Sequence, residues 1–152
     1  MPKTKTRPRN VRVLLVEDNL VDAGLTIEAF RESEFPLEVT RVRDGEEAMA
    51  FLLREGNQAE AVLPDVILLD LDLPRKDGYW VLGQIRENPR LAHIPVIILT
   101  YLKNDEDLRR AYDHQANFYL VKPMDLNQLF EIVRYLEDVW FAPYRFERSL
   151  SR

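Results

Sequence analysis

Five short, mainly apolar stretches run through the chain, and each is followed by apolar residues spaced three or four positions apart. The stretch from Val66 to Leu69 is continuously apolar, which is typical of a strand buried on both faces of a parallel sheet. The stretch from Leu37 to Val42 alternates apolar with polar residues, which predicts a strand at the sheet edge. The five predicted strands cover residues 11–16, 37–42, 66–70, 95–100 and 118–121.

The segments between these strands predict helices. The first helix is capped by Asn19 or Asp22 and carries Leu25 on its apolar face, whereas the second is capped by Asp44 and closed by Gly56. Three further helices are predicted after the third, fourth and fifth strands. Repeats of strand and helix with short connections predict an α/β fold, a doubly wound parallel sheet whose crossovers are right-handed.

Polar, reactive side chains stand at the ends of four predicted strands. In a doubly wound sheet the carboxyl ends of the strands converge on one crevice, where sites are built. We therefore expect these side chains to lie together, although each one alone also has a structural explanation as a helix cap, turn former, strand residue or solvated charge. They are Glu17 and Asp18 after the first strand, Asp70 at the third, Thr100 at the fourth and Lys122 at the fifth.

The residue types at this edge predict phosphoryl chemistry that depends on a metal ion. Three crowded carboxylates repel one another and need a cation, and oxygen ligands without histidine or cysteine favour a hard ion, here Mg²⁺. The Thr100 hydroxyl and the Lys122 ammonium group can bind the oxygens of a phosphoryl group, whose transfer needs alignment and charge neutralisation. Asp70 is then a competent nucleophile that would form an aspartyl phosphate.

The composition limits the classes of protein and site. The chain has 152 residues, which suggests one domain. It has no cysteine and only two histidines, which excludes disulfides and argues against a histidine-rich metal centre. No apolar run approaches the ~20 residues of a membrane span, and no secretory signal begins the chain. We therefore expect a cytoplasmic protein with no membrane contact.

The charge is unevenly distributed along the chain. The net charge is −5, yet residues 1–10 contain basic residues and no acidic residue. We predict a disordered, solvated arm at 1–10, and binding to nucleic acid is disfavoured because the remaining sequence has no basic face with interleaved aromatic residues. Residues 11–139 would form the folded domain, and residues 140–152 an aromatic C-terminal extension.

Taken together, the motifs at the strand ends resemble the receiver domain of two-component response regulators. The resemblance covers residues 11–139 and implies a flavodoxin-like sheet with strand order 2-1-3-4-5. It implies a phosphoacceptor signalling protein, not an enzyme, whose only chemistry is its own phosphorylation and dephosphorylation. The matching motifs are Glu17-Asp18, the Leu-Leu-Asp ending at Asp70 together with Pro74 and Gly78, then Thr100, and finally Lys122-Pro123.

The resemblance also implies a role for each matching residue. Asp70 would accept a phosphoryl group from a histidine kinase. Mg²⁺ would be held by Asp18 directly, by Glu17 through water and by the main-chain carbonyl of Asp72, with Asp70 completing the site. The positions implied to bind the phosphoryl oxygens or to switch upon phosphorylation are Thr100, Lys122 and the aromatic residue Tyr119.

The segment from Asp70 to Gly78, the arm and the tail resemble the small stand-alone regulators that pair with bacterial and cyanobacterial phytochrome kinases. We therefore expect a phytochrome-type histidine kinase as partner.

Two residues depart from the family pattern. The acidic side chain of Asp72 is hypothesised to change the lifetime of the phosphate, or to have no kinetic role. Tyr101 would either narrow access to the site or lie on the surface.

The last predicted helix carries more apolar surface than one core stripe requires. A surplus apolar stripe marks a contact surface. We predict a homodimer formed by the fourth helix, the fifth strand, the last helix and the tail, the same surface that would carry the signal. Alternatively, the tail folds back and covers the stripe. The residues predicted at this surface are Ile132, Tyr135, Val139, Phe141, Tyr144 and Phe146.

Two other functions remain as alternatives. Asp70 and Asp72 after an apolar strand also look like the nucleophile and general acid of haloacid-dehalogenase-type phosphatases. In those enzymes, however, the metal-binding acids follow the lysine, whereas Glu17 and Asp18 precede Asp70. The second alternative is an interaction module that keeps the fold without phosphorylation, which the complete set of site residues disfavours.

Overall fold

The computed structural model describes most of the expected folded domain. For five strand residues it describes only the backbone. They are Thr100, Phe118, Leu120, Val121 and Lys122. The predicted arm at 1–10, the extension at 140–152 and most of the last two predicted helices lie outside the described residues. Those described are 11–32, 37–55, 62–101, 106, 109–110, 113, 118–122, 127 and 134.

The strands form a single parallel sheet in the order β2-β1-β3-β4-β5, which confirms the predicted flavodoxin-like order. The alternating strand β2 lies at the edge, as its pattern predicted, whereas the apolar strand β3 lies at the centre and is buried throughout. The strands are β1 (Val11–Val16), β2 (Leu37–Val42), β3 (Val66–Asp70), β4 (Val96–Tyr101) and β5 (Phe118–Lys122).

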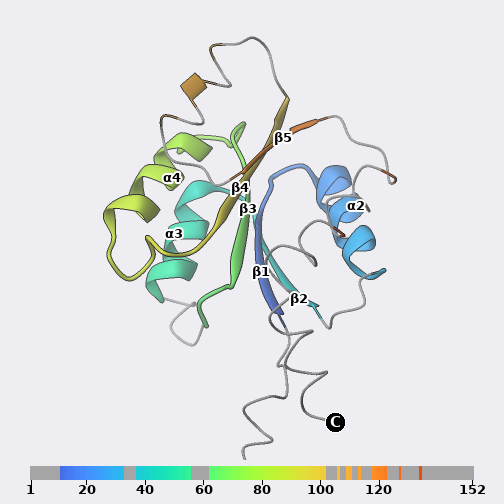
Figure 1. Ribbon diagram of the computed structural model, residues 1–152, viewed down its shortest axis with the longest axis horizontal. Helices are drawn as coiled ribbons and strands as arrows, with labels where there is room; N and C mark the ends of the chain where they lie inside the picture. Colours follow the sequence, from blue (N-terminus) through green and yellow to red (C-terminus); the bar gives the residue numbers. More distant parts are fainter. Residues whose placement is uncertain are drawn as a thin grey trace, which may run out of the picture.

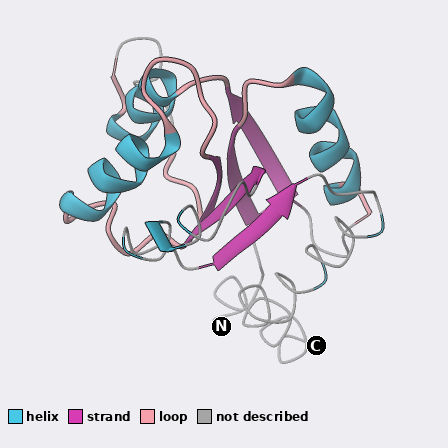
Figure 2. Cartoon of the chain, turned by 90° about the horizontal axis from the view of Figure 1, so that it is seen from above, coloured by secondary structure: helices cyan, strands magenta, loops and turns pink. Residues whose placement is uncertain are grey.

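Three described helices cover the two faces of this sheet. Helices α3 (Gly45–Leu53) and α4 (Gly78–Glu87) pack on one face, and α2 (Leu20–Phe30) packs on the other (Figure 1). The view from above shows the sheet as a middle layer between them (Figure 2). None of the described helices is both long and apolar enough to cross a membrane.

The two-residue period of a strand divides the core into two clusters. Along β1, Leu14 and Val16 pack toward α3 and α4, while Val13 and Leu15 pack toward α2. All four are essentially excluded from solvent. Strand β1 is therefore packed on both of its faces. This packing also fixes the position of Glu17 and Asp18, which follow the strand.

Side chains fix where each helix begins. The Asn19 Oδ1 accepts a hydrogen bond from the Asp22 N–H (2.9 Å), and the Asp44 Oδ1 accepts one from the Glu47 N–H (2.8 Å). Asp77 caps α4 in the same way. These bonds satisfy main-chain donors that the first turn of a helix leaves without an internal partner.

Two details of the predicted helices were wrong. Helix α3 ends at Leu53, because Arg54 adopts the left-handed conformation (φ 58°) and stops the helix two residues before Gly56. Of the predicted apolar face of α2, Ala29 and Phe30 are buried, but Leu25 is 37% exposed because it lies at the edge of the buried stripe. The buried residues of α2 are Ala23, Thr26, Ala29 and Phe30.

Candidate functional site

Pairing of the two central strands brings three carboxylates together at the carboxyl edge of the sheet. Val16 at the end of β1 lies opposite Leu69 in β3, so the residues that follow each of them are neighbours. One oxygen from each of Glu17, Asp18 and Asp70 lies within 4.8 Å of the other two. Glu17 is 1% exposed and Asp70 is 3% exposed, whereas Asp18 faces solvent.

Main-chain N–H groups orient two of these carboxylates. The Asp70 Oδ1 accepts a hydrogen bond from the Asp72 N–H at 3.0 Å, and the Glu17 Oε2 accepts one from the Asn19 N–H at 3.2 Å. In both cases the donor is two residues farther along the chain, and for Asp70 this is the geometry of an Asx turn. The turn after each strand therefore sets the direction of the carboxylate that precedes it.

The geometry and charge of this cluster suit a divalent hard cation. Two like charges 4 Å apart repel by about 4 kcal/mol at the effective dielectric constant near a protein surface. Oxygen ligands about 2.1 Å from Mg²⁺ can stand about 4.2 Å apart across the ion. Three oxygens within 4.8 Å of one another are close enough to surround one such ion, either directly or through a bound water.

The loop from Asp70 to Gly78 passes close to its own beginning. The Gly78 N–H donates to the Leu71 carbonyl at 3.1 Å. A Cβ atom at position 78 would lie 2.6 Å from the Asp70 carbonyl oxygen and 2.6 Å from the Leu71 Cα. These are main-chain contacts that cannot move aside easily, so glycine is required for the loop to close beside Asp70.

The strand register places the two remaining predicted site positions at the same edge. Asp70 lies opposite Leu99, so Thr100 is the next residue along β4, one strand away. Thr100 pairs with Val121, and Lys122 ends the neighbouring strand β5. The roles predicted for Thr100 and Lys122 stay predictions, because only their backbones are described.

Three other predicted residues are placed as follows. Tyr119 is 9% exposed and packs within the cluster below α3 and α4, and its switch role stays a prediction. Tyr101 is 42% exposed, which places it on the surface. Asp72 is exposed, and the use of its carbonyl as a metal ligand stays a prediction. The predicted dimer residues, from Ile132 to Phe146, lie outside the described residues.

Two features beside the cluster were not anticipated from the sequence. Leu20 and Val21, on the first turn of α2, are 74% and 71% exposed, and one residue, Asn19, separates them from the acidic pair. Arg41 donates hydrogen bonds to the main-chain carbonyls of Glu17 and Asp18. The sequence contains a hint of each feature. Arg41 is a charged residue on a strand face whose other positions are apolar, and Leu20 and Val21 are an apolar pair that follows the helix cap Asn19.

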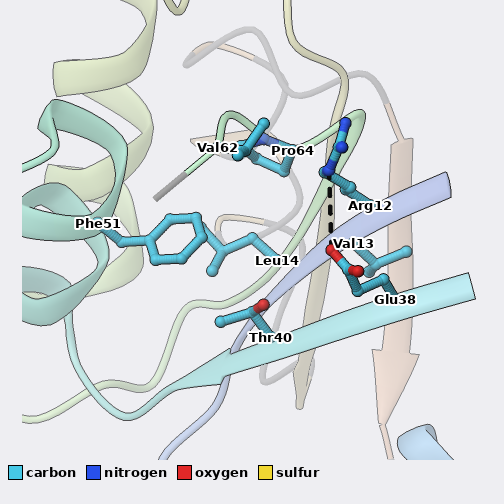
Figure 3. Close-up of a pocket in the computed structure, with 8 residues that line it drawn as sticks. All are labelled: Arg12, Val13, Leu14, Glu38, Thr40, Phe51, Val62 and Pro64. Atoms are coloured by element: carbon cyan, nitrogen blue, oxygen red, sulfur yellow. Dashed lines mark ion pairs between the residues drawn. The ribbon is translucent and has the colours of Figure 1, made fainter. Parts of the chain in front are cut away.

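A cavity lies at the opposite end of the sheet. Its volume is about 160 Å³, and it lies between β1, β2, α3 and the chain that leads into β3. Figure 3 shows the ion pair of Arg12 and Glu38 beside it (3.7 Å) and the ring of Phe51 extending from α3. Its lining contains none of the three clustered acids. The remaining lining residues are Val13, Leu14, Thr40, Val62 and Pro64.

Residues 13–134 match the family described as "Response regulator receiver domain". The chain is 42% identical over 128 residues to the response regulator Rcp1 of Synechocystis sp., covering 84% of this chain and 87% of that protein. It is similar in structure to the phosphorylated cyanobacterial phytochrome response regulator RcpA, with TM-score 0.80, 47% identity and coverage of 88% and 95% of the two chains. The Mn²⁺-bound form of Rcp1 gives TM-score 0.77 at 42% identity, with 86% and 94% coverage.

Proposed function

Because this chain belongs to the response regulator receiver domain family, we propose that it accepts a phosphoryl group on Asp70 from a histidine kinase. The observation that carries the proposal is the buried Asp70 carboxylate, with oxygens of Glu17 and Asp18 within 4.8 Å. Both of these acids precede Asp70 in the chain, which is the order of the receiver family and not that of the dehalogenase-type phosphatases.

The transfer step is a nucleophilic displacement at phosphorus. A carboxylate oxygen of Asp70 attacks the phosphorus of a phosphohistidine, and the P–N bond breaks as the new O–P bond forms. The electron pair of the broken bond returns to the imidazole nitrogen of the kinase. The hydrogen bond from the Asp72 N–H to the Asp70 Oδ1 orients the nucleophile, so the attacking geometry is set before the donor arrives.

A divalent ion, Mg²⁺ or Mn²⁺, would be held by Asp18 and Asp70, with Glu17 acting through water and Asp72 through its carbonyl. When bound, such an ion neutralises the negative charge that the acids and the phosphoryl oxygens bring together. The all-oxygen composition of the cluster supports this choice. The Mn²⁺-bound structure of Rcp1 shows that a relative binds such an ion.

On the other side of Asp70, Thr100 and Lys122 would bind the phosphoryl oxygens by hydrogen bond and by charge. Their backbone positions on the two adjacent strands support these roles. Tyr119 would respond to the movement of Thr100 and carry the signal to the surface formed by the fourth helix, β5 and the last helix. Its buried position between the sheet and the helices is compatible with that role.

The class of kinase that we propose is the phytochrome type. The support is similarity to Rcp1 and to RcpA, which is described as a phytochrome response regulator.

We also propose a homodimer through the aromatic and apolar residues between Ile132 and Phe146. Sedimentation of the full chain and of a variant truncated after Asp138 measures this association, and the same number of subunits in both would contradict a role of the tail.

Phosphotransfer from purified phytochrome-type and unrelated histidine kinases tests the main proposal. With Mg²⁺ present, the wild-type chain is expected to gain label fastest from a phytochrome-type kinase, and Asp70→Asn is expected to gain none. Glu38→Gln, which removes a carboxylate at the other end of the sheet, is the matched control and should be labelled normally. Labelling of Asp70→Asn at the wild-type rate would contradict the assignment of the acceptor.

A further inference from the structure

The edge strand β2 carries one charged residue on the face that packs toward α2. Leu37 and Val39 of this strand pack with the α2 side of the core. By the two-residue alternation of a strand, Arg41 is the next position on that face. It lies opposite Leu15 in β1, two residues before Glu17, the first of the acids. The pattern of Leu37 and Val39 predicts an apolar residue at this position, where the chain has an arginine instead.

The guanidinium group of Arg41 reaches the turn that contains two of the clustered acids. Its Nε donates a hydrogen bond to the main-chain carbonyl of Glu17 at 2.9 Å, and its Nη2 donates to that of Asp18 at 3.2 Å. Two donors from one rigid, planar group contact two consecutive carbonyls. A lysine ammonium group at the same place lacks this planar fork.

The same turn is also bound to β2 through the main chain. The Glu17 N–H donates to the Val42 carbonyl at 3.0 Å. Together with the two bonds from Arg41, this ties three successive peptide groups around Glu17 and Asp18 to the end of β2. The Glu17 and Asp18 side chains therefore leave a fixed backbone on the side that faces Asp70.

We infer that Arg41 is a positioning residue, which holds the main-chain carbonyls of Glu17 and Asp18 so that their carboxylates converge on one cation. Its two hydrogen bonds go to main-chain oxygens. It therefore adds a positive charge beside the Glu17–Asp18 turn without occupying a carboxylate oxygen through these bonds. Both effects lower the cost of keeping the acids together. This inference rests on the proposed metal binding and names a residue that does not itself contact the ion.

Titration calorimetry of Mg²⁺ and of Mn²⁺ into the metal-free full chain tests the inference. Removing a group that orients metal ligands lowers affinity by about 10-fold, so Arg41→Met should raise Kd by that factor. Arg41→Lys, which keeps the charge but loses the fork, should give an intermediate Kd. Arg12→Met is the matched control, because Arg12 lies at the other end of the same two strands and pairs with Glu38.

A merely structural role of Arg41 gives a different result. It would lower the unfolding temperature of the metal-free protein and leave Kd of the folded fraction unchanged. A Kd for Arg41→Met within about two-fold of the wild type therefore overturns the inference. If Arg41→Met does not fold, Arg41→Lys decides by the same criterion. A wild-type chain that binds neither ion overturns the proposed metal site itself, which distinguishes the two failures.

Discussion

The amino and carboxyl ends of the parallel sheet carry charge in opposite ways. At the amino end, Arg12 of β1 and Glu38 of β2 are register partners and form an ion pair at 3.7 Å. At the carboxyl end, Glu17 and Asp18 follow the same strand β1 and meet a third acid, Asp70, within 4.8 Å. Opposite charges are paired at one end, and like charges are collected at the other.

This difference separates what the fold needs from what the function needs. Strand β1 contributes to both ends, so the geometry of the sheet does not itself require like charges to meet. The same-sign cluster, two of whose three acids are buried, is an arrangement that a ligand of opposite charge stabilises. The partly exposed ion pair at the amino end contributes little to stability. The carboxyl end is therefore where substitutions and metal ions are expected to have the larger effects.

The largest effect on stability is expected at Gly78, which lies against the main chain of Asp70 and Leu71. The added methyl of Gly78→Ala meets the Asp70 carbonyl oxygen at 2.6 Å, and the free energy of unfolding should fall by about 3 kcal/mol. Gly83→Ala in the same helix meets nothing within 4 Å and should be stabilised by roughly 0.5–1 kcal/mol. Urea denaturation measures both, and equal stabilities would contradict the close approach.

The next effect is stabilisation by the metal ion. Mg²⁺ at a hundred times its Kd should raise the free energy of unfolding by about 2.7 kcal/mol. Asp18→Asn should lose most of this gain, yet without metal it should be at least as stable as the wild type, because one like charge is removed. Thermal denaturation with and without Mg²⁺, at matched ionic strength, makes the comparison. A metal-free Asp18→Asn protein that is clearly less stable would contradict the repulsion.

A smaller effect is expected at Asp44, which links two loops near the acids. Its Oδ1 caps α3, and its Oδ2 pairs at 2.7 Å with Arg75, a residue in the left-handed conformation (φ 61°). Asp44→Ala should cost about 1 kcal/mol of stability through the lost cap. Asp44→Asn keeps a capping oxygen and should cost less. If the two variants were equally stable in urea, the cap would not be the main contribution.

The smallest effect is expected at the amino end. Arg12→Met removes an ion pair whose side chains are 30% and 58% exposed. The free energy of unfolding should change by less than about 0.5 kcal/mol. Mg²⁺ affinity should not change. A large loss of either quantity, measured by denaturation and calorimetry, would show that the two ends are coupled.

The sheet and the acidic cluster were predictable because both follow from local patterns. Continuous apolar runs identified the central strands, and the alternating run identified the edge strand. Glu17 and Asp18 come directly after β1, and Asp70 is the last residue of β3. The shared edge of parallel strands then places them together without further information. The short-range caps by Asn19 and Asp44 were predictable for the same reason.

The groups that support the cluster were not predictable from such patterns. Arg41 binds main-chain carbonyls 24 and 23 residues away, and Arg75 pairs with Asp44 31 residues away. A carbonyl oxygen is present at every residue, so no sequence signal marks the one that an arginine selects. Similarly, Arg54 ends α3 in a conformation that sequence preference assigns to glycine, which is why the helix was predicted to continue to Gly56.

The pairing of Val16 with Leu69 has a consequence for the newly made chain. All three acids belong to the first 70 residues, yet Asp70 is separated from Glu17 by more than fifty residues of sequence. Until β1 and β3 dock, Asp70 is an ordinary aspartate in an extended polymer, with no neighbouring acids to share an ion. The chain can therefore be phosphorylated on Asp70 only after it has folded, and a histidine kinase should not phosphorylate newly made or denatured copies.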